Sequence, residues 1–227
     1  MKANKASMKY ATLNLLLGAA ILSQGFLHRH LALTLFWLGA SFMILGIAYL
    51  TRRPGILGKR SDGAIAGWSW LFLLPLHLYI QAVWHFCRLL SRESASCIVN
   101  PRLIVGRRLL ASEVPASVQL IVDLTCELPE PTGVRHRRDY RLFPILDATA
   151  PDPHQLREFI SSLPDVPTYI HCAQGHGRTG LFAIAYLVQR GICSTIEEAE
   201  KLLLTARPGI VLNAQQRSFA NALLVSA

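Results

Sequence analysis

The sequence predicts an α/β domain preceded by two or three transmembrane helices. Three observations lead to this prediction. Long apolar runs without charge fill the first ninety residues, short β-branched runs alternate with helical patterns further on, and the net charge of +9 belongs to the N-terminal part. We expect a membrane region at residues 1–92 and a second domain at residues 93–227. The apolar fraction of 52% against 16% charged residues excludes a disordered chain.

The charge distribution argues against a nucleic-acid partner. Residues 1–92 contain ten Lys or Arg and a single acid, Asp62, whereas residues 93–227 contain thirteen basic and thirteen acidic residues. Cations that flank apolar runs are typical of membrane segments, while nucleic-acid binding requires a basic face on a folded domain. The lipid bilayer is therefore the partner that the charges predict, and no nucleic acid is expected.

Three apolar stretches are long enough, or nearly so, to cross a bilayer, at about residues 10–27, 31–50 and 64–84. A hydrocarbon core of about 30 Å requires roughly 20 residues of helix. A signal peptide is an alternative for the first stretch, because three lysines precede it. No small-residue cleavage pattern follows, however, and the second apolar stretch begins at once. We therefore expect a membrane hairpin.

The third stretch leaves the topology open, because it contains Pro75, His77 and Gln81 and has tryptophans near its ends. It either spans the bilayer or lies partly in the interface. The N-terminus and the 51–63 loop are rich in Lys and Arg, which assigns both of them to the cytoplasm. Three spans put the second domain outside, whereas two spans and an interfacial third segment keep it in the cytoplasm.

The second domain shows two kinds of periodicity. Short runs rich in Val, Ile or Tyr predict strands, at residues 103–106, 119–124 and 168–171. Stretches with apolar residues on one face predict helices, at residues 154–163, 181–190, 195–206 and 215–225. Thr195 followed by Glu198 is a capping-box pattern. Strands that alternate with helices favour a central, mostly parallel sheet flanked by helices.

The chemistry concentrates in residues 171–180, His-Cys-Ala-Gln-Gly-His-Gly-Arg-Thr-Gly. An apolar strand runs into Cys172, and a loop with Gly175 and Gly177 leads to Arg178 and an apolar helix. Both glycines allow positive φ angles. The arginine can hold two phosphate oxygens, and the same positive field favours the thiolate form of the cysteine. A thiolate beneath a bound phosphate is a nucleophile directed at phosphorus.

Backbone N–H groups of this loop are expected to bind the phosphate, because successive amides at a helix N-terminus form an anion cradle. The residues that would contribute them are Ala173, Gln174, Gly175, His176 and Gly177. A buried structural cysteine followed by a chance turn is the alternative interpretation.

This string resembles the Cys-x5-Arg loop of the protein tyrosine phosphatase superfamily, and more narrowly its dual-specificity branch. A rhodanese-like domain also has a cysteine in a loop after a strand, but Arg178-Thr179-Gly180 fits the phosphatase pattern better. Residues 100–106, 122–125 and 207–216 resemble further segments of the same family. The resemblance covers about residues 97–225 and implies a protein tyrosine phosphatase-like α/β fold.

The resemblance implies roles for individual residues. Cys172 would attack phosphorus, Arg178 would hold the phosphate oxygens, and Asp147 would protonate the leaving oxygen, which requires a general acid. Two other acids are candidates for that last role: Asp152, which suits a helix cap, and Asp165, which lies in a Pro-Asp-Val-Pro turn.

Four further residues would assist the reaction. His171 would form a hydrogen bond within the loop, and Thr179 would donate its hydroxyl to the cysteine sulfur. Either Gln215 or Gln216 would position the hydrolytic water. The other cysteines show no disulfide or metal-ligand spacing, so no metal and no other cofactor is predicted.

The sequence therefore predicts a membrane-anchored cysteine-dependent phosphatase that acts on phosphoprotein (Tyr, Ser or Thr) or phospholipid phosphomonoesters. The loop has no lysine, which disfavours a highly charged inositol lipid. The alternative is an inactive phosphate-binding module that tethers a partner to the membrane. Because a nucleophilic thiolate is best kept reduced, we expect an integral protein of the plasma (inner) membrane with a cytoplasmic catalytic domain.

Overall fold

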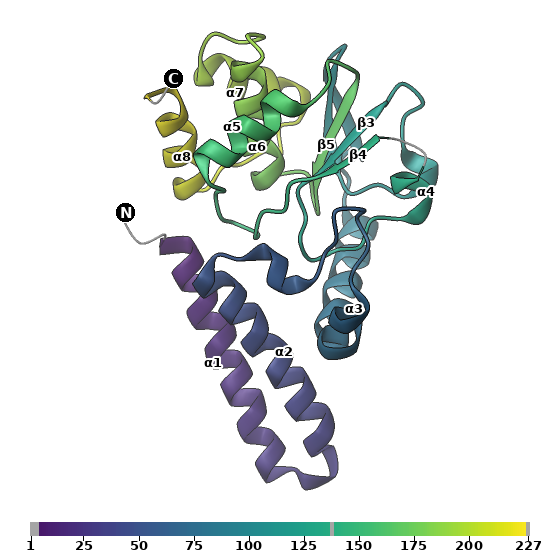
Figure 1. The fold of residues 1–227 in the computed structure, drawn as a ribbon, viewed down its shortest axis with the longest axis vertical. Coiled ribbons are helices and arrows are strands. Elements are labelled where there is room, and N and C mark those ends of the chain that lie inside the picture. Colours follow the sequence, from purple (N-terminus) through teal and green to yellow (C-terminus); the bar gives the residue numbers. More distant parts are fainter. Residues whose placement is uncertain (1–4, 137–138, 226–227) are drawn as a thin grey trace. The chain divides into compact units, whose positions relative to one another are not determined.

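The computed structural model of the chain describes residues 5–136 and 139–225 (Figure 1). The chain divides into two compact units. The helical unit comprises Met1–Arg60, Ala64–Leu90 and Cys126–Pro129, and the α/β unit comprises Ser61–Gly63, Ser91–Thr125 and Glu130–Ala227. The units interleave in the sequence, because residues 61–63 of the α/β unit and residues 126–129 of the helical unit each lie within the range of the other.

The helical unit contains three long helices, α1 (Lys5–Leu27), α2 (Ala32–Thr51) and α3 (Gly67–Leu90). Figure 1 shows α1 and α2 side by side as an antiparallel hairpin. Each of the three is long and apolar enough to cross a membrane. The third apolar stretch forms a helix that begins three residues later and ends six residues later than the sequence pattern predicts.

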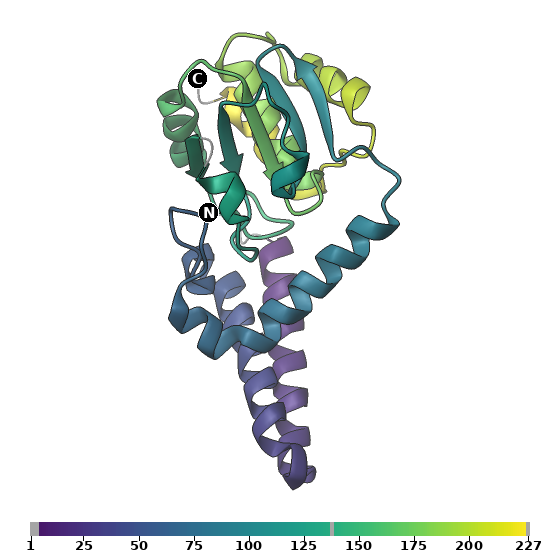
Figure 2. The same cartoon turned by 90° about the vertical axis from the view of Figure 1, so that its right-hand side faces the viewer.

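Helix α3 is broken near its start. Leu73 has non-helical angles (φ −112°, ψ 17°), because Pro75 cannot donate a backbone hydrogen bond to the preceding turn. The carbonyl of Phe72 accepts hydrogen bonds from Trp37 Nε1 at 3.0 Å and from Ser41 Oγ at 3.3 Å instead. The kinked α3 runs obliquely to the hairpin rather than alongside it (Figure 2).

The α/β unit is built on a five-stranded sheet with the order β1-β2-β5-β3-β4. The strands are β1 (Ser96–Asn100), β2 (Leu103–Arg107), β3 (Leu120–Asp123), β4 (Asp139–Leu142) and β5 (Thr168–Cys172). Only β1 pairs antiparallel, and the other pairs are parallel. The expected mostly parallel sheet is therefore confirmed, and β5 lies at its centre.

Helices cover both faces of this sheet. They are α4 (Thr132–Arg135), α5 (Pro153–Ser162), α6 (Gly177–Gln189), α7 (Ile196–Ala206) and α8 (Ala214–Val225). Figure 1 shows α5 to α8 on one side and α4 on the other. Alternate residues of each inner strand face the two sides: in β5, Ile170 belongs to the larger core and Tyr169 to the smaller one.

The predicted strands correspond to β2, β3 and β5, and the predicted helices to α5, α6, α7 and α8. The sequence pattern missed β1 and β4, which are the two edge strands. β4 reads Asp-Tyr-Arg-Leu, and its exposed and half-buried residues alternate, so it lacks the apolar run that identifies a buried strand. The capping prediction holds for Thr195, whose hydroxyl accepts the N–H of Glu198 at 3.1 Å; the Glu198 carboxylate accepts the N–H of Ser194 at 2.8 Å, so the reciprocal half of the box is shifted by one residue.

Candidate active site

The cysteine of the motif ends the central strand of the sheet. Cys172 is the last residue of β5, residues 173–176 form the loop, and α6 begins at Gly177. Its side chain is buried, and the N–H of Gly175 donates a hydrogen bond to its sulfur at 3.3 Å. The sulfur therefore lies inside the loop at the N-terminus of α6, where amides and the helix dipole stabilise negative charge.

Gly175 can only be glycine in this loop. Its φ is +75°, and a Cβ there would lie 2.3 Å from the carbonyl carbon of Gly106 in β2. The prediction of positive φ was right for Gly175 and wrong for Gly177, which does not adopt one. Gly177 is needed for space instead, because a Cβ there would lie 2.8 Å from Oε1 of Gln216.

A second arginine supports the loop from outside. Arg207 follows α7 and is 3% exposed; its Nε donates to the carbonyl of Gly175 at 2.9 Å and its Nη2 to that of Gln174 at 3.1 Å. The same Nη2 lies 2.9 Å from Oε2 of Glu93, which also lies 2.8 Å from Nε2 of His176. Arg207 opens the segment 207–216 that resembles the phosphatase family, and these contacts show that its side chain packs against the loop. Glu93 was not predicted, since nothing in its sequence context marks it.

The arginine of the motif is buried and meets the predicted general acid. Arg178 is 2% exposed, and its Nη1 donates to the carbonyl of Ile145 at 3.0 Å. Its Nε lies 3.1 Å from Oδ1 of Asp147, whose side chain is 68% exposed. The structure therefore brings Asp147 to the loop although 25 residues separate it from Cys172 in the sequence.

The other two candidate acids have structural roles. Oδ1 of Asp152 accepts the N–H groups of His154 and Gln155, each at 3.0 Å, and so caps α5. Asp165 forms an exposed ion pair with Arg102. These contacts leave Asp147 as the acid that lies against the motif arginine.

Gln216 is better placed than Gln215 to act at the loop. Gln216 is buried and packs against Gly177, and its Nε2 lies 3.5 Å from the carbonyl of Thr149, two residues after Asp147. Asn213 holds the same segment, since its Nδ2 donates to the carbonyl of Ala148 at 2.9 Å. The Gln215 side chain has no comparable contact with the loop among the described hydrogen bonds.

His171 and Thr179 are both fully buried beside the cysteine. Nδ1 of His171 lies 3.3 Å from the carbonyl of Cys172, which agrees with a hydrogen bond inside the loop, and its ring stacks on Tyr169. The Thr179 hydroxyl makes no hydrogen bond within the described part of the chain. Its donation to the cysteine sulfur therefore stays a prediction.

Asp123, Glu130 and His171 form a buried cluster whose ligand atoms lie within 4.8 Å of one another, and whose donor types suit a metal ion. The oxygens of Asp123 accept hydrogen bonds from Thr125 and, at 2.8 Å, from the hydroxyl of Tyr140. Burial and the Asp123 carboxylate raise the pKa of Tyr140 well above its ordinary value, so this phenol remains a donor. Protein donors thus satisfy the aspartate.

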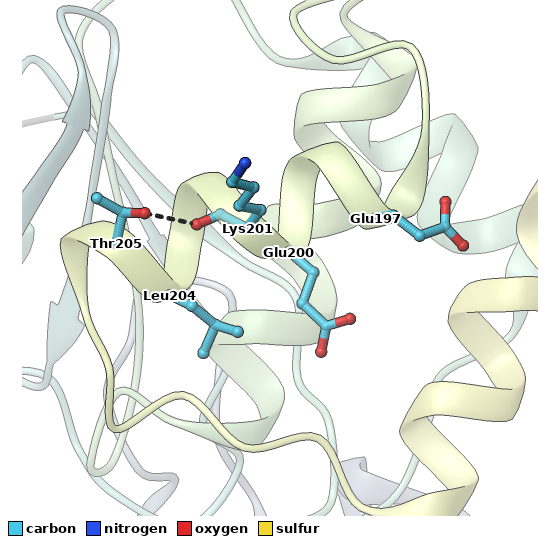
Figure 3. A pocket seen from close by; sticks show the side chains of 5 residues that line it. All are labelled: Glu197, Glu200, Lys201, Leu204 and Thr205. Atoms are coloured by element: carbon cyan, nitrogen blue, oxygen red, sulfur yellow. Dashed lines mark hydrogen bonds between the residues drawn. The ribbon is translucent and has the colours of Figure 1, made fainter.

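A surface hollow on α7 is lined by Glu197, Glu200, Lys201, Leu204 and Thr205 (Figure 3). Its hydroxyl contact, from Thr205 Oγ1 to the carbonyl of Lys201 at 2.9 Å, is local to the helix. None of the predicted site residues lines it, so the hollow is separate from the candidate active site.

Comparison with known sequences agrees with this geometry. The family model for a Swiss Army Knife protein with a DSP-PTPase phosphatase domain matches residues 85–222. The tyrosine-protein phosphatase CDC14 homolog of Schizosaccharomyces pombe is 30% identical over 142 residues, which cover 60% of this chain and 25% of that protein. The chain thus matches about a quarter of the length of this curated relative.

Solved structures share the fold. Tk-PTP in its active form superposes with a TM-score of 0.53 at 24% identity and covers 59% of this chain and 98% of its own. The human tyrosine phosphatase-like serine/threonine/tyrosine-interacting protein gives a TM-score of 0.50 at 18% identity, covering 58% of this chain and 96% of its own. At these identities the likeness shows the fold alone.

The predicted protein tyrosine phosphatase-like fold is therefore confirmed, and the region that carries it is the α/β unit with the motif loop. Because the family model matches more than half of the chain, the protein belongs to the Swiss Army Knife family with a DSP-PTPase phosphatase domain, a domain of the phosphoric monoester hydrolase class.

Proposed function

We propose that the protein is a membrane-anchored cysteine-dependent phosphatase that hydrolyses phosphomonoesters through a phosphocysteine intermediate. One observation carries this proposal. The sulfur of Cys172 lies inside a loop whose Gly175 N–H points to it at 3.3 Å, and the buried guanidinium of Arg178 follows in the first turn of α6. A module that only binds phosphate has no need of a thiolate at this position.

In the proposed reaction, the Cys172 thiolate attacks phosphorus and forms a P–S bond while the bond from phosphorus to the ester oxygen breaks. Arg178 and the loop amides hold the non-bridging oxygens, and Asp147 donates its proton to the departing oxygen. Water then attacks phosphorus, the P–S bond breaks, and Asp147 takes the proton from that water. Inorganic phosphate leaves and the thiolate is restored.

The proposed substrates are phosphomonoesters of proteins, on Tyr, Ser or Thr, or of phospholipids. Asp147 is 68% exposed, so the residue proposed to meet the leaving group faces solvent rather than a deep pocket. This favours a site open to several phosphoesters. The anchor brings the site near the bilayer, where both substrate classes occur.

The helical unit supports the proposed anchoring. Besides their length, its helices expose large apolar side chains to their surroundings, among them Phe26, Leu27, Leu33, Leu71, Phe86 and Leu89. Helices that expose many large apolar side chains need cover, and lipid tails supply it for an uncharged helix.

We further propose two spans, α1 and α2, with α3 along the interface. Before α3, the carbonyl of Gly63 accepts the N–H of Glu130 at 2.9 Å, and after α3, Glu93 binds Arg207. Both flanking segments therefore pack within the α/β unit, whereas a spanning helix would put them on opposite sides of the bilayer. With the cationic N-terminus inside, the phosphatase domain is cytoplasmic, at the plasma (inner) membrane.

Phosphate release tests the activity. The full-length protein in mixed micelles is offered a phosphotyrosyl peptide and an anionic phospholipid phosphate side by side, with Cys172→Ser as the blank. We expect release from at least one substrate and a loss of at least about 10³-fold in the variant, which keeps its affinity for phosphate. Turnover by Cys172→Ser at the wild-type rate would overturn the mechanism. Phosphate binding without any turnover by the wild type would favour the phosphate-binding module.

Labelling tests the topology. A cysteine is introduced at His30, in the turn of the hairpin, or at Ser91, after α3; both residues are exposed. In intact cells an impermeant maleimide is expected to label His30→Cys above the parent protein and to leave Ser91→Cys unchanged. Labelling of Ser91→Cys in intact cells would contradict the two-span arrangement.

A further inference from the structure

Glu93 connects two basic side chains at the phosphate-binding loop. It lies between α3 and β1, and its Oε2 contacts Nη2 of Arg207 at 2.9 Å and Nε2 of His176 at 2.8 Å. His176 belongs to the loop itself, and Arg207 contacts the loop from α7. One carboxylate thus joins the loop to the residue that supports it.

Arg207 sets the direction of two peptide planes in the loop. The carbonyls of Gln174 and Gly175 both point outward to its guanidinium. Because the C=O and N–H of a trans peptide point in opposite directions, the N–H groups of Gly175 and His176 face the interior of the loop. The contact from the Gly175 N–H to the cysteine sulfur agrees with this orientation.

The arginine depends on Glu93 for its charge partner. Arg207 is 3% exposed, and its other described acceptors are the carbonyls of Ser94, Gln174 and Gly175 and the sulfur of Cys97, none of which is a carboxylate. A buried guanidinium that loses its carboxylate is left with an uncompensated charge, which is strongly unfavourable.

Glu93 is itself held in position, although 41% of its side chain is exposed. A Cβ at Gly209 would lie 2.2 Å from its Oε1, so the segment after Arg207 closes around the carboxylate. The hydrogen bond from His176, with a smaller contribution from Arg207, lowers the pKa of Glu93 and keeps it ionised.

We propose that Glu93 is a positioning residue of the active site, which fixes the anion-binding orientation of residues 174–176 through Arg207 and His176. This inference rests on the proposed function, because it concerns the same loop. Glu93 does not touch the reacting atoms. It lies three residues after α3, so the segment that leaves the helical unit supplies part of the support of the active-site loop.

The test uses the full-length protein in detergent micelles and two readouts that need no turnover. The first is the pH profile of iodoacetamide alkylation at Cys172, followed by mass spectrometry of its peptide. The second is the protection of Cys172 by inorganic phosphate. The variant is Glu93→Gln, and the matched control is Glu158→Gln, which removes an exposed carboxylate from α5.

We expect Glu93→Gln to move the midpoint of the alkylation profile up by about one pH unit and to weaken phosphate protection about tenfold. The direction is informative, because removing a negative charge by itself would move that midpoint down. Glu158→Gln is expected to match the wild type. A midpoint that falls or stays unchanged in Glu93→Gln, with unchanged phosphate affinity, would overturn the proposal.

Two further variants, Arg207→Lys and Glu93→Asp, test whether the effect runs through the guanidinium and whether it survives a milder change. In an Arg207→Lys background, Glu93→Gln is expected to produce less than half of its effect, because the carboxylate acts through the guanidinium; full additivity would overturn this route. If Glu93→Gln does not fold, Glu93→Asp replaces it. A smaller upward shift of the alkylation midpoint supports the positioning role of Glu93, and a wild-type profile refutes it. If the wild type hydrolysed no phosphoester, the proposed function would fail, yet both readouts would still test Glu93.

Discussion

Nε of Arg178 lies 3.1 Å from Oδ1 of Asp147, so the proposed proton donor contacts the proposed phosphate-binding arginine. The arginine is buried and the aspartate is largely exposed. The carboxylate therefore neutralises part of the positive charge of Arg178, which an incoming phosphate needs. We therefore expect a phosphate that binds at Nε to compete with Asp147 for this contact.

Asp147→Asn is expected to bind phosphate more tightly and to turn over more slowly. The carboxylate of this ion pair is largely exposed, so we expect the pair to contribute about 0.2–1 kcal/mol and its loss to improve inhibition by inorganic phosphate about one- to fivefold. Loss of the general acid slows poor leaving groups by about 10²–10⁴-fold and good ones far less. Steady-state kinetics with aryl phosphates of graded leaving-group acidity measure both effects.

Asp152→Asn is the matched control, because Asp152 caps α5 and does not contact Arg178 among its described hydrogen bonds. It removes the same charge five residues further along the chain and is expected to leave both kinetic parameters near the wild type. Equal slowing of good and poor leaving groups in Asp147→Asn, or a larger effect of Asp152→Asn, would assign the acid elsewhere.

A second prediction concerns Gly175, where φ is +75° and a side chain would meet the backbone of β2. Gly175→Ala is expected to lower kcat/KM by about 10²-fold or more, because the loop must shift away from its phosphate-binding geometry. Gly191→Ala is the control: its φ is +68°, but a Cβ there meets nothing within 4 Å. It should cost only backbone strain, about 1–2 kcal/mol.

Kinetics and thermal unfolding of the two glycine variants separate the effect of backbone strain from the effect of the contact with Gly106. Both variants should lose stability, whereas only Gly175→Ala should lose activity. Similar activity losses in the two would show that the contact with Gly106 is unimportant.

The residues that the sequence could predict lie close together in the chain or form strong local patterns. Cys172 and Arg178 flank one short loop, and the strand before them is apolar, so local spacing was enough to predict that they lie together. Asp152 and Thr195 were recognised as helix caps because a cap is defined by the two or three residues that follow it.

The parts that were missed depend on contacts between distant segments. Glu93 reaches Arg207 across 114 positions, and a single acid after an apolar helix carries no pattern that reveals such a partner. The use of Gly177 was misjudged for the same reason, since the constraint comes from Gln216 rather than from the backbone angle. β1 and β4 were missed because edge strands are half exposed.

A third prediction distinguishes the two glutamines. Gln216→Ala is expected to slow hydrolysis of the phosphocysteine about tenfold, because its amide lies between the loop and the Asp147 segment. Rapid-quench kinetics would then show a burst of the leaving group, followed by a slower steady state. Gln215→Ala is expected to affect this second step much less. A burst in Gln215→Ala alone would assign the water-positioning role to that residue.

A fourth prediction follows from the lowered pKa of Glu93. Its carboxylate binds fewer protons in the folded than in the unfolded protein. The stabilisation from this group is therefore complete at a pH above the ordinary pKa of 4.5, and it disappears as the pH falls through the lowered pKa of the folded state. The thermal midpoint of the wild type should therefore exceed that of Glu93→Gln near neutral pH, and the two should converge in acid. Solvent screening limits the difference to about 1 kcal/mol. Circular dichroism melts of both proteins between about pH 3 and pH 6 measure it, and a gap that widens toward low pH would contradict the ionised contact.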